Sequence, residues 1–169
     1  MRPRSEFLDK LLGASRSNNS LLCVGLDVDW RRLPPSFTKN ADGAYQFAVA
    51  IIEATQDLVC AYKPNIAFWE AMGPEGLAAL KAVREHINID VPVIVDAKRD
   101  DIPNTAEAYV RALFDVYGFD AATVNPYLGA ESLRTFLGRP DRGAFVLCKT
   151  SNPGSGDPQD LWVVQEGKP

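Results

Sequence analysis

The residues that organise this chain are Val91-Pro-Val-Ile-Val-Asp96-Ala-Lys98-Arg-Asp-Asp101-Ile-Pro-Asn-Thr105. They begin with an apolar run rich in β-branched residues, which predicts a short strand buried on both faces. The strand passes directly into a dense run of ionisable residues, namely Asp96, Lys98, Arg99, Asp100 and Asp101. Side chains alternate along a strand, so Asp96 and Lys98 are expected to point the same way, with Asp101 in the following turn. We therefore predict two carboxylates and an ammonium at the C-terminal end of a core strand, where α/β proteins bind their ligands.

A repeat of strand, loop and helix runs through the whole chain. Strands are predicted at residues 21–27, 59–63, 91–96, 120–125 and 143–149, with a possible short strand at 161–164. Helices are predicted at residues 5–16, 42–58, 74–86, 102–117 and 130–137, and loops or turns at 30–40, 65–73 and 150–158. This order predicts a parallel sheet with helices outside it, either as an open doubly wound sheet or as a (β/α)₈ barrel.

Polar residues at the strand ends favour the barrel. A doubly wound nucleotide domain usually has a Gly-x-Gly-x-x-Gly turn after its first strand, which this chain lacks. In a barrel, functional groups come from the C-terminal ends of several strands. Such groups here are Asp27, Lys63, Asp96 with Lys98, Asn125, and residues 149–151. Each one alone could be a solvent contact, and charge runs are usually solvated, but a series of five along core strands favours a shared rim.

The composition is that of an ordinary globular domain. The chain has 169 residues, 46% of them hydrophobic and 24% charged, with a net charge of −4. It shows no basic face for nucleic acid, no apolar run of the roughly 20 residues that span a bilayer, and no secretory signal. Cys23, Cys60 and Cys148 lie far apart in apolar runs, so we expect buried free thiols in a reducing cytoplasm, and no metal site.

The charged stretch also resembles a known family signature. Asp96-Ala-Lys98-Arg-Asp-Asp101-Ile is similar to the Asp-x-Lys-Arg-Gly-Asp-Ile form found in the orotidine 5′-monophosphate decarboxylase suprafamily, although Asp100 stands in place of Gly. The resemblance extends to Leu22-Cys-Val-Gly-Leu-Asp27, Tyr62-Lys63-Pro-Asn and Thr150-Ser151-Asn-Pro-Gly-Ser. A glycine at position 100 would tolerate positive φ, so the extra Cβ and charge of Asp100 could disturb the turn.

The resemblance implies a cofactor-independent enzyme that releases CO₂ from orotidine 5′-monophosphate to give UMP, with no metal. The implied catalytic residues are Lys98 as proton donor, Asp96 beside the substrate carboxylate, and Lys63 and Asp101 completing the charged network. The implied substrate-binding residues are Asp27 and Thr105 at the ribose and Ser151 at the pyrimidine edge. Asn125 is a further candidate for substrate binding because of its position at a strand end on the same rim. The segment that carries Asp101 and Thr105 would be lent by a neighbouring subunit, which implies a homodimer with shared sites.

The chain is short for this fold. A barrel needs eight βα units and about 250 residues, whereas five units are predicted here. We therefore expect residues 1–169 to be one truncated barrel domain, ending after the fifth strand and its loop, without the loops that grip the phosphate. Whether such a partial chain is active stays open. Two other functions stay open as well: a Mg²⁺-dependent keto-sugar-phosphate decarboxylase of the same suprafamily, and a non-catalytic nucleotide-binding subunit.

Overall fold

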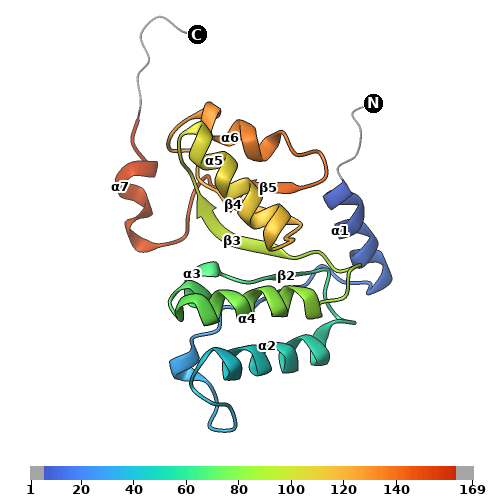
Figure 1. The fold of residues 1–169 in the computed structure, drawn as a ribbon. Helices are drawn as coiled ribbons and strands as arrows, with labels where there is room; N and C mark the ends of the chain where they lie inside the picture. The colour runs from blue at the N-terminus through green and yellow to red at the C-terminus, as the bar shows by residue number, and fades with distance from the viewer. Residues whose placement is uncertain (1–5, 163–169) are drawn as a thin grey trace, which may run out of the picture.

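The computed structural model describes residues 6–162. Its strands are β1 (Cys23–Gly25), β2 (Ala61–Lys63), β3 (Ile94–Arg99), β4 (Ala121–Val124) and β5 (Gly143–Val146). β1 pairs with β2, β3 with β4 and β4 with β5, all in parallel. Single parallel bridges from Tyr62 to Val93 and from Asn65 to Asp96 connect β2 to β3. The predicted parallel sheet is confirmed, but it does not close into a barrel: within residues 6–162, β1 and β5 are open edges (Figure 1).

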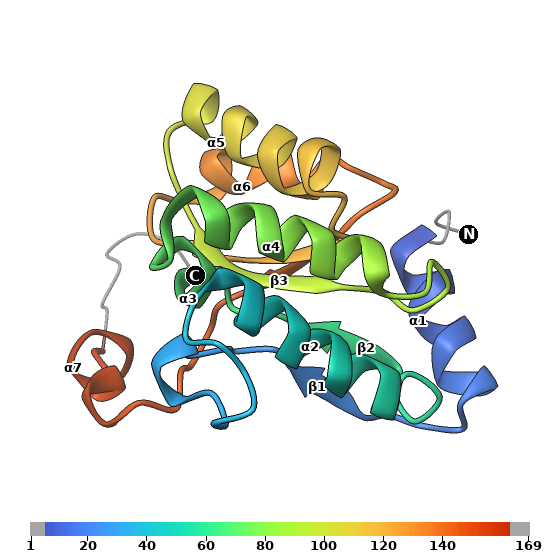
Figure 2. The ribbon, with the colours of Figure 1, turned by 60° about the horizontal axis from the view of Figure 1, so that its bottom comes forward.

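Helices follow the strands as the sequence predicts. They are α1 (Glu6–Ser17), α2 (Ala41–Thr55), α3 (Ile66–Glu70), α4 (Gly73–His86), α5 (Pro103–Val110), α6 (Ala130–Leu137) and α7 (Gly156–Gln159). The helix that begins as α5 continues as a π-helical turn, Arg111–Val116. In Figure 2, α2, α4, α5 and α6 cover one side of the curved sheet, while α1 lies at one end of it. No helix among the described residues is long and apolar enough to cross a membrane.

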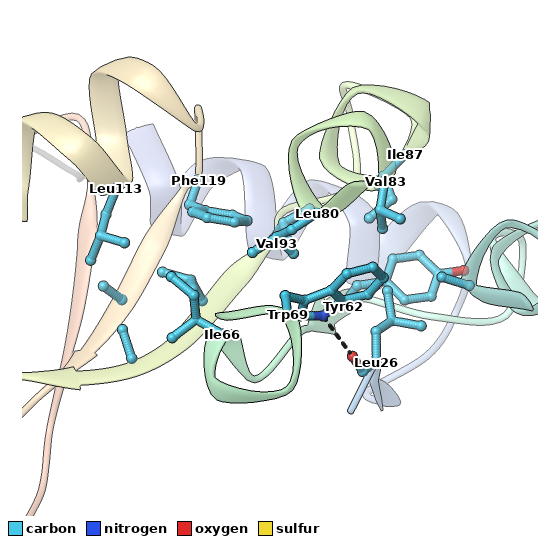
Figure 3. Close-up of a cluster of buried hydrophobic side chains, with 14 of the residues drawn as sticks. Leu26, Tyr62, Ile66, Trp69, Leu80, Val83, Ile87, Val93, Leu113 and Phe119 are labelled. Carbon is cyan, nitrogen blue, oxygen red and sulfur yellow. Dashed lines mark hydrogen bonds between the residues drawn. The ribbon is translucent and has the colours of Figure 1, made fainter. Parts of the chain in front are cut away.

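The main core lies between the sheet and these outer helices (Figure 3). Tyr62 of β2 and Trp69 of α3 are fully buried in it, and each finds a partner for its polar atom. Trp69 Nε1 donates to the Leu26 carbonyl at 3.4 Å, and the Tyr62 hydroxyl donates to the Ile52 carbonyl at 3.2 Å. Because both polar tips are satisfied, the large aromatic rings can be buried without the cost of an unpaired group.

A smaller apolar cluster holds α1 against the other face of the sheet. Phe7 of α1 packs with Cys60, Ala61, Ile94 and Ala121. A Cβ at Gly143 of β5 would lie only 2.5 Å from the Phe7 ring, so only glycine lets the helix approach this closely.

Charges reinforce the same contact. Lys10 of α1 lies 2.6 Å from Asp120, which also receives Arg84 at 3.3 Å and the Val93 backbone N–H at 2.8 Å. We call Asp120, Lys10 and Arg84 the lower cluster. It ties α1, α4 and the start of β4 together.

Several local predictions differ from the structure, among them the predicted loop at 30–40, which contains the 3₁₀ turn Trp30–Arg32. Residues 65–73, predicted as a turn, contain α3, whose N-terminus is capped by the Asn65 side chain accepting from Ala67 N at 3.1 Å. Ile66 and Trp69, three positions apart and both buried, carried a helical signal that the segment's shortness obscured. The predicted loop at 150–158 contains a 3₁₀ turn and the start of α7. The possible strand at 161–164 is not formed at 161 and 162, and its last two residues lie outside the described range.

The three cysteines are free, as expected, but only Cys60 is buried. Cys23 and Cys148 are exposed, so the prediction that they are buried was wrong. Cys23 lies on β1 and Cys148 lies two residues beyond the end of β5, and these strands are the two open edges of the sheet. A strand at an open edge has no neighbour to cover its side chains.

Candidate active site

Three charged side chains meet at the C-terminal ends of β2 and β3. Lys98 Nζ lies 2.6 Å from Asp96 Oδ1, and Lys63 Nζ lies 3.5 Å from Asp96 Oδ2. We call Asp96, Lys63 and Lys98 the upper cluster. Its carboxylate side chain is 11% exposed, whereas the side chains of Lys63 and Lys98 are 37% and 48% exposed. The two ammonium groups are therefore open to an incoming ligand while the carboxylate holds them.

The backbone of β3 is irregular where this cluster forms. The register between β3 and β4 shifts between Val95 and Arg99, and Lys98 adopts a left-handed conformation with φ of +47°. A non-glycine residue in that conformation is strained by about 1–3 kcal/mol and persists only where its surroundings hold it. The simple alternation that we assumed for this strand does not apply at Lys98, although its ammonium still reaches Asp96.

Thr123 of β4 contacts both the Asp96 side chain and the irregular backbone at Ala97 and Lys98. Its hydroxyl donates to Asp96 Oδ1 at 2.8 Å and accepts from the backbone N–H groups of Ala97 and Lys98 at 3.0 and 2.9 Å. Thr123 was not predicted as a site residue from the sequence. Its signal was weak but present, since it is a polar residue within the otherwise apolar strand Ala121–Val124.

The environment of Asp96 favours its charged form. Partial burial alone would raise the pKa of Asp96, but hydrogen bonds from Lys98 and Thr123, with the charges of Lys98 and Lys63, lower that pKa below its ordinary value. Asp96 is therefore a carboxylate at neutral pH, held by donors on three neighbouring strands.

Asp27 and Asn125 lie on the strand ends to either side. Asp27 Oδ1 accepts from the Asn65 backbone N–H at 3.2 Å, and Asn65 is itself bridged to Asp96. Asn125 donates its backbone N–H to the Arg99 carbonyl at 2.9 Å, and its side-chain oxygen accepts from Tyr127 N at 3.0 Å. The Asp27 carboxylate is exposed at the rim, whereas the Asn125 amide oxygen is used in shaping its own turn.

Asp101 and Thr105 lie outside the upper cluster. Asp101 Oδ1 accepts from the Ile102 backbone N–H at 2.8 Å, and Thr105 N donates to Asn104 Oδ1 at 2.9 Å. Within residues 6–162, no hydrogen bond or ion pair joins either side chain to Asp96, Lys63 or Lys98. The neighbouring Ile102 is 52% exposed, so this segment presents an uncovered surface beside the site.

A comparison with protein families matches most of the chain. The profile of the Orotidine 5′-phosphate decarboxylase / HUMPS family matches residues 20–167. The chain belongs to this family. The match includes every strand and every side chain of the upper cluster.

Relatives in the decarboxylase family agree over almost all of this chain. Orotidine 5′-phosphate decarboxylases from Herpetosiphon aurantiacus and Thermomicrobium roseum are each 52% identical over 163 residues, 96% of this chain, but 61% and 58% of their own lengths. Among solved structures, an OMP decarboxylase from Leishmania donovani matches with a TM-score of 0.83 at 42% identity, covering 93% of this chain and 59% of that chain. A UMP synthase from the same organism matches with a TM-score of 0.84 at 44% identity, covering 96% and 34%. The chain spans about three fifths of the length of these curated relatives.

The departure from the family signature at Asp100 causes no backbone strain, although Oδ1 of its carboxylate is buried without a hydrogen-bond partner among the described residues. Asp100 is not among the residues with positive φ, so its Cβ meets no backbone strain, and the expected disturbance of the turn does not occur. Its Oδ2 accepts from the Leu128 backbone N–H at 2.9 Å, which links the loop after β3 to the loop after β4. Arg99 pairs with Glu70, and its guanidinium carbon lies 5.1 Å from the centre of the Tyr109 ring.

The loop after β5 carries the last residues of the predicted rim. Ser151 is exposed, on a loop ordered by Thr150 and Gln159. Lys149 Nζ pairs with Asp160 at 2.6 Å rather than with the upper cluster. Among the described residues, no group of three or more His, Cys, Asp or Glu side chains is arranged to hold a metal ion.

Proposed function

We propose that the protein containing this chain is an orotidine 5′-monophosphate decarboxylase, which releases CO₂ and forms UMP without a cofactor. The observation that carries the proposal is the upper cluster: an exposed Lys98 ammonium 2.6 Å from Asp96, with Lys63 on the second carboxylate oxygen. Membership of the family supports the same reaction. Decarboxylation leaves an electron pair on a ring carbon, so a fixed positive charge is the group that the reaction needs.

In this mechanism the C6–carboxylate bond of the pyrimidine breaks and CO₂ departs. The electron pair that remains on C6 takes a proton from the Lys98 ammonium, which later regains a proton from solvent. Asp96 lies beside the substrate carboxylate. Two like charges about 4 Å apart repel by roughly 4 kcal/mol at an effective dielectric constant of 20, which is a useful part of the 8–23 kcal/mol that enzymes typically supply.

The remaining rim residues would bind the nucleotide. Asp27 is proposed to bind the ribose, Ser151 the pyrimidine edge, and Asn125 to shape the rim between them. Asp101 and Thr105 are proposed to act in the site of a second subunit. Two observations support a homodimer with shared sites: both side chains are separate from the upper cluster in their own chain, and Ile102 beside them is exposed.

We propose that residues 1–169 form the first five units of one (β/α)₈ barrel domain in a longer enzyme. The open edges at β1 and β5 would be joined by three further units, which would also supply the phosphate-binding loops. The coverage of about three fifths of each curated relative supports this. A reducing cytoplasm is the proposed compartment, because Cys23, Cys60 and Cys148 are all free.

The test is turnover by the natural gene product that contains this chain. Loss of orotidine 5′-monophosphate absorbance would be followed with a metal chelator present, and UMP identified as the product. We expect turnover that is insensitive to the chelator. A folded protein that binds UMP without turnover would instead indicate a nucleotide-binding subunit, and metal-dependent decarboxylation of a keto-sugar phosphate would indicate the other branch of the suprafamily.

A further inference from the structure

The Thr123 hydroxyl uses its full hydrogen-bonding capacity at one point of the site. A hydroxyl has one donor and two acceptor positions. Thr123 donates to Asp96 Oδ1 at 2.8 Å and accepts from Ala97 N at 3.0 Å and Lys98 N at 2.9 Å. All three contacts cross from β4 to the irregular end of β3.

The two accepted bonds hold the strained backbone. Within the register shift between Val95 and Arg99, the N–H groups of Ala97 and Lys98 both donate to Thr123 Oγ1, although successive N–H groups of a regular strand point to opposite neighbours. Without that oxygen, two backbone donors beside the site would lose their partner, and the left-handed conformation of Lys98 would lose the contacts that maintain it.

The hydrogen bond that Thr123 donates goes to Asp96, the acidic partner of Lys98 in the ion pair. Asp96 Oδ1 accepts both from Thr123 at 2.8 Å and from Lys98 Nζ at 2.6 Å. One oxygen atom of Thr123 therefore constrains where the Lys98 main chain lies and where the carboxylate that receives its ammonium points.

We propose that Thr123 is a positioning residue for catalysis, which aims the Lys98 ammonium by fixing its left-handed backbone and the Asp96 carboxylate together before substrate binds. This inference rests on the proposed function, because it assigns Thr123 a part in delivering the Lys98 proton. Thr123 itself touches neither the reacting atoms nor the substrate in this account. It acts through Asp96 and Lys98.

The pKa of Asp96 is a measurable quantity that depends on the proposed role of Thr123. The groups that face Asp96 are Lys63 from β2, Lys98 from its own strand, and Thr123 from β4. The Thr123 hydrogen bond contributes to lowering the pKa of Asp96, so its removal raises that pKa. A threonine with only a packing role would not affect the titration of Asp96.

The test compares Thr123→Val with Thr123→Ser in the natural gene product. Valine keeps the shape and loses the hydroxyl, whereas serine keeps the hydroxyl and loses a methyl group. We expect Thr123→Val to lower kcat by about 10- to 100-fold with KM little changed, and to move the acidic limb of the kcat profile to higher pH. Thr123→Ser should restore most of kcat and the original profile. Equal kcat and equal pH profiles in the valine variant and the wild type would overturn the proposal.

A second readout separates this inference from the proposed function. The pKa of Asp96 would be measured from the ¹³C shift of its carboxyl carbon in wild type, Thr123→Val and Thr123→Ser. We expect that pKa to rise in the valine variant alone, because only valine removes the hydrogen bond to the carboxylate. If wild type shows no turnover, the proposed function fails, yet an unchanged Asp96 pKa would still overturn the positioning role and a raised one would support it. If the valine variant does not fold, Thr123→Ala takes its place in both measurements.

Discussion

The upper and lower clusters each surround one aspartate with two cations, at opposite ends of the same sheet. In the lower cluster the side chains of Asp120, Lys10 and Arg84 are 8%, 19% and 10% exposed. In the upper cluster the Asp96 side chain is similarly buried, with 11% exposed, but the side chains of Lys63 and Lys98 are 37% and 48% exposed. Both cations are largely buried in the lower cluster, whereas both cations are accessible to solvent in the upper cluster. Exposure of the cations, rather than their number, distinguishes a candidate active site from a structural ion pair.

The balance of forces differs between the two clusters as well. At Lys10, burial lowers the pKa and outweighs the attraction of Asp120. At Asp96, burial would raise the pKa, but hydrogen bonds from Lys98 and Thr123 outweigh it and lower that pKa. Backbone strain separates them further, because Lys98 is left-handed while no residue of the lower cluster has positive φ. We therefore expect the lower cluster to affect stability and the upper cluster to affect catalysis.

The largest expected difference in stability is between the two aspartates. Asp120→Ala removes the only carboxylate paired with the buried Arg84 among the described residues and the acceptor of the Val93 N–H, so we expect a loss of about 3–5 kcal/mol in the free energy of unfolding. The matched variant Asp96→Ala should cost much less, since both of its cations can turn to water. Urea titration of the two variants measures this. Equal losses would remove the distinction between the clusters.

A smaller effect is expected from removing one cation of the lower cluster. Lys10→Met keeps the apolar stem that covers the strand but loses the 2.6 Å ion pair with Asp120. We expect a loss of about 1–3 kcal/mol in unfolding free energy, with kcat unchanged because Lys10 lies at the far end of the sheet. Thermal denaturation and steady-state turnover would be measured on the same preparation. A change in kcat with unchanged stability would contradict the assignment.

The titration of the Asp96 carboxyl group also distinguishes the two clusters, although it involves only a small change in the free energy of unfolding. Its folded-state pKa is lowered, so the stabilisation that it contributes is present above its unfolded value of about 3.9 and is lost as pH falls through the lower folded value. Between pH 7 and about 5, Asp96 should therefore stay ionised. Lys98→Met removes a donor and a charge, so it should raise the Asp96 pKa in a ¹³C titration. An unchanged value would show that the ion pair does not form in solution.

The smallest effect is expected at Asp100, beside the upper cluster. Asp100→Gly restores the family signature but loses the bond to Leu128 N and frees the backbone of the unfolded chain. We expect a loss of about 1 kcal/mol in unfolding free energy and little change in kcat. Asp100→Asn, which retains an acceptor oxygen, is the control for the hydrogen bond. A large fall in kcat for the glycine variant would mean that the link between the two loops shapes the site.

Much of the fold follows from local patterns in the sequence. The run before Asp96 predicted β3, and the repeat of strands and helices predicted a parallel sheet, because buried parallel strands are apolar throughout and therefore easy to recognise. The short helix α3 was missed because five residues are too few for periodicity to be clear. Cys23 and Cys148 were misplaced because burial at an edge depends on neighbours that local sequence does not specify.

The candidate active site could be predicted from the sequence only in part. Strand ends placed Lys63, Asp96 and Lys98 together, since parallel strands end at one rim. Thr123 could not be found in this way, because its role depends on a register shift between β3 and β4 that no single strand encodes. Asp101 was placed beside Asp96 and Lys98 from its spacing, and Thr105 was included through family resemblance. The fold of one chain keeps both apart from the cluster, so the prediction for Asp101 from spacing was wrong within one chain.

The most direct test of the account is the rate of CO₂ release by the natural gene product and its Lys98→Met variant, at saturating orotidine 5′-monophosphate, with UMP affinity measured for both. We predict that the variant binds UMP within a few-fold of wild type but loses at least about 10³-fold in turnover, since it keeps the stem of Lys98 and lacks the proton. Substantial turnover by the Lys98→Met variant would contradict the assignment of the upper cluster as the catalytic site.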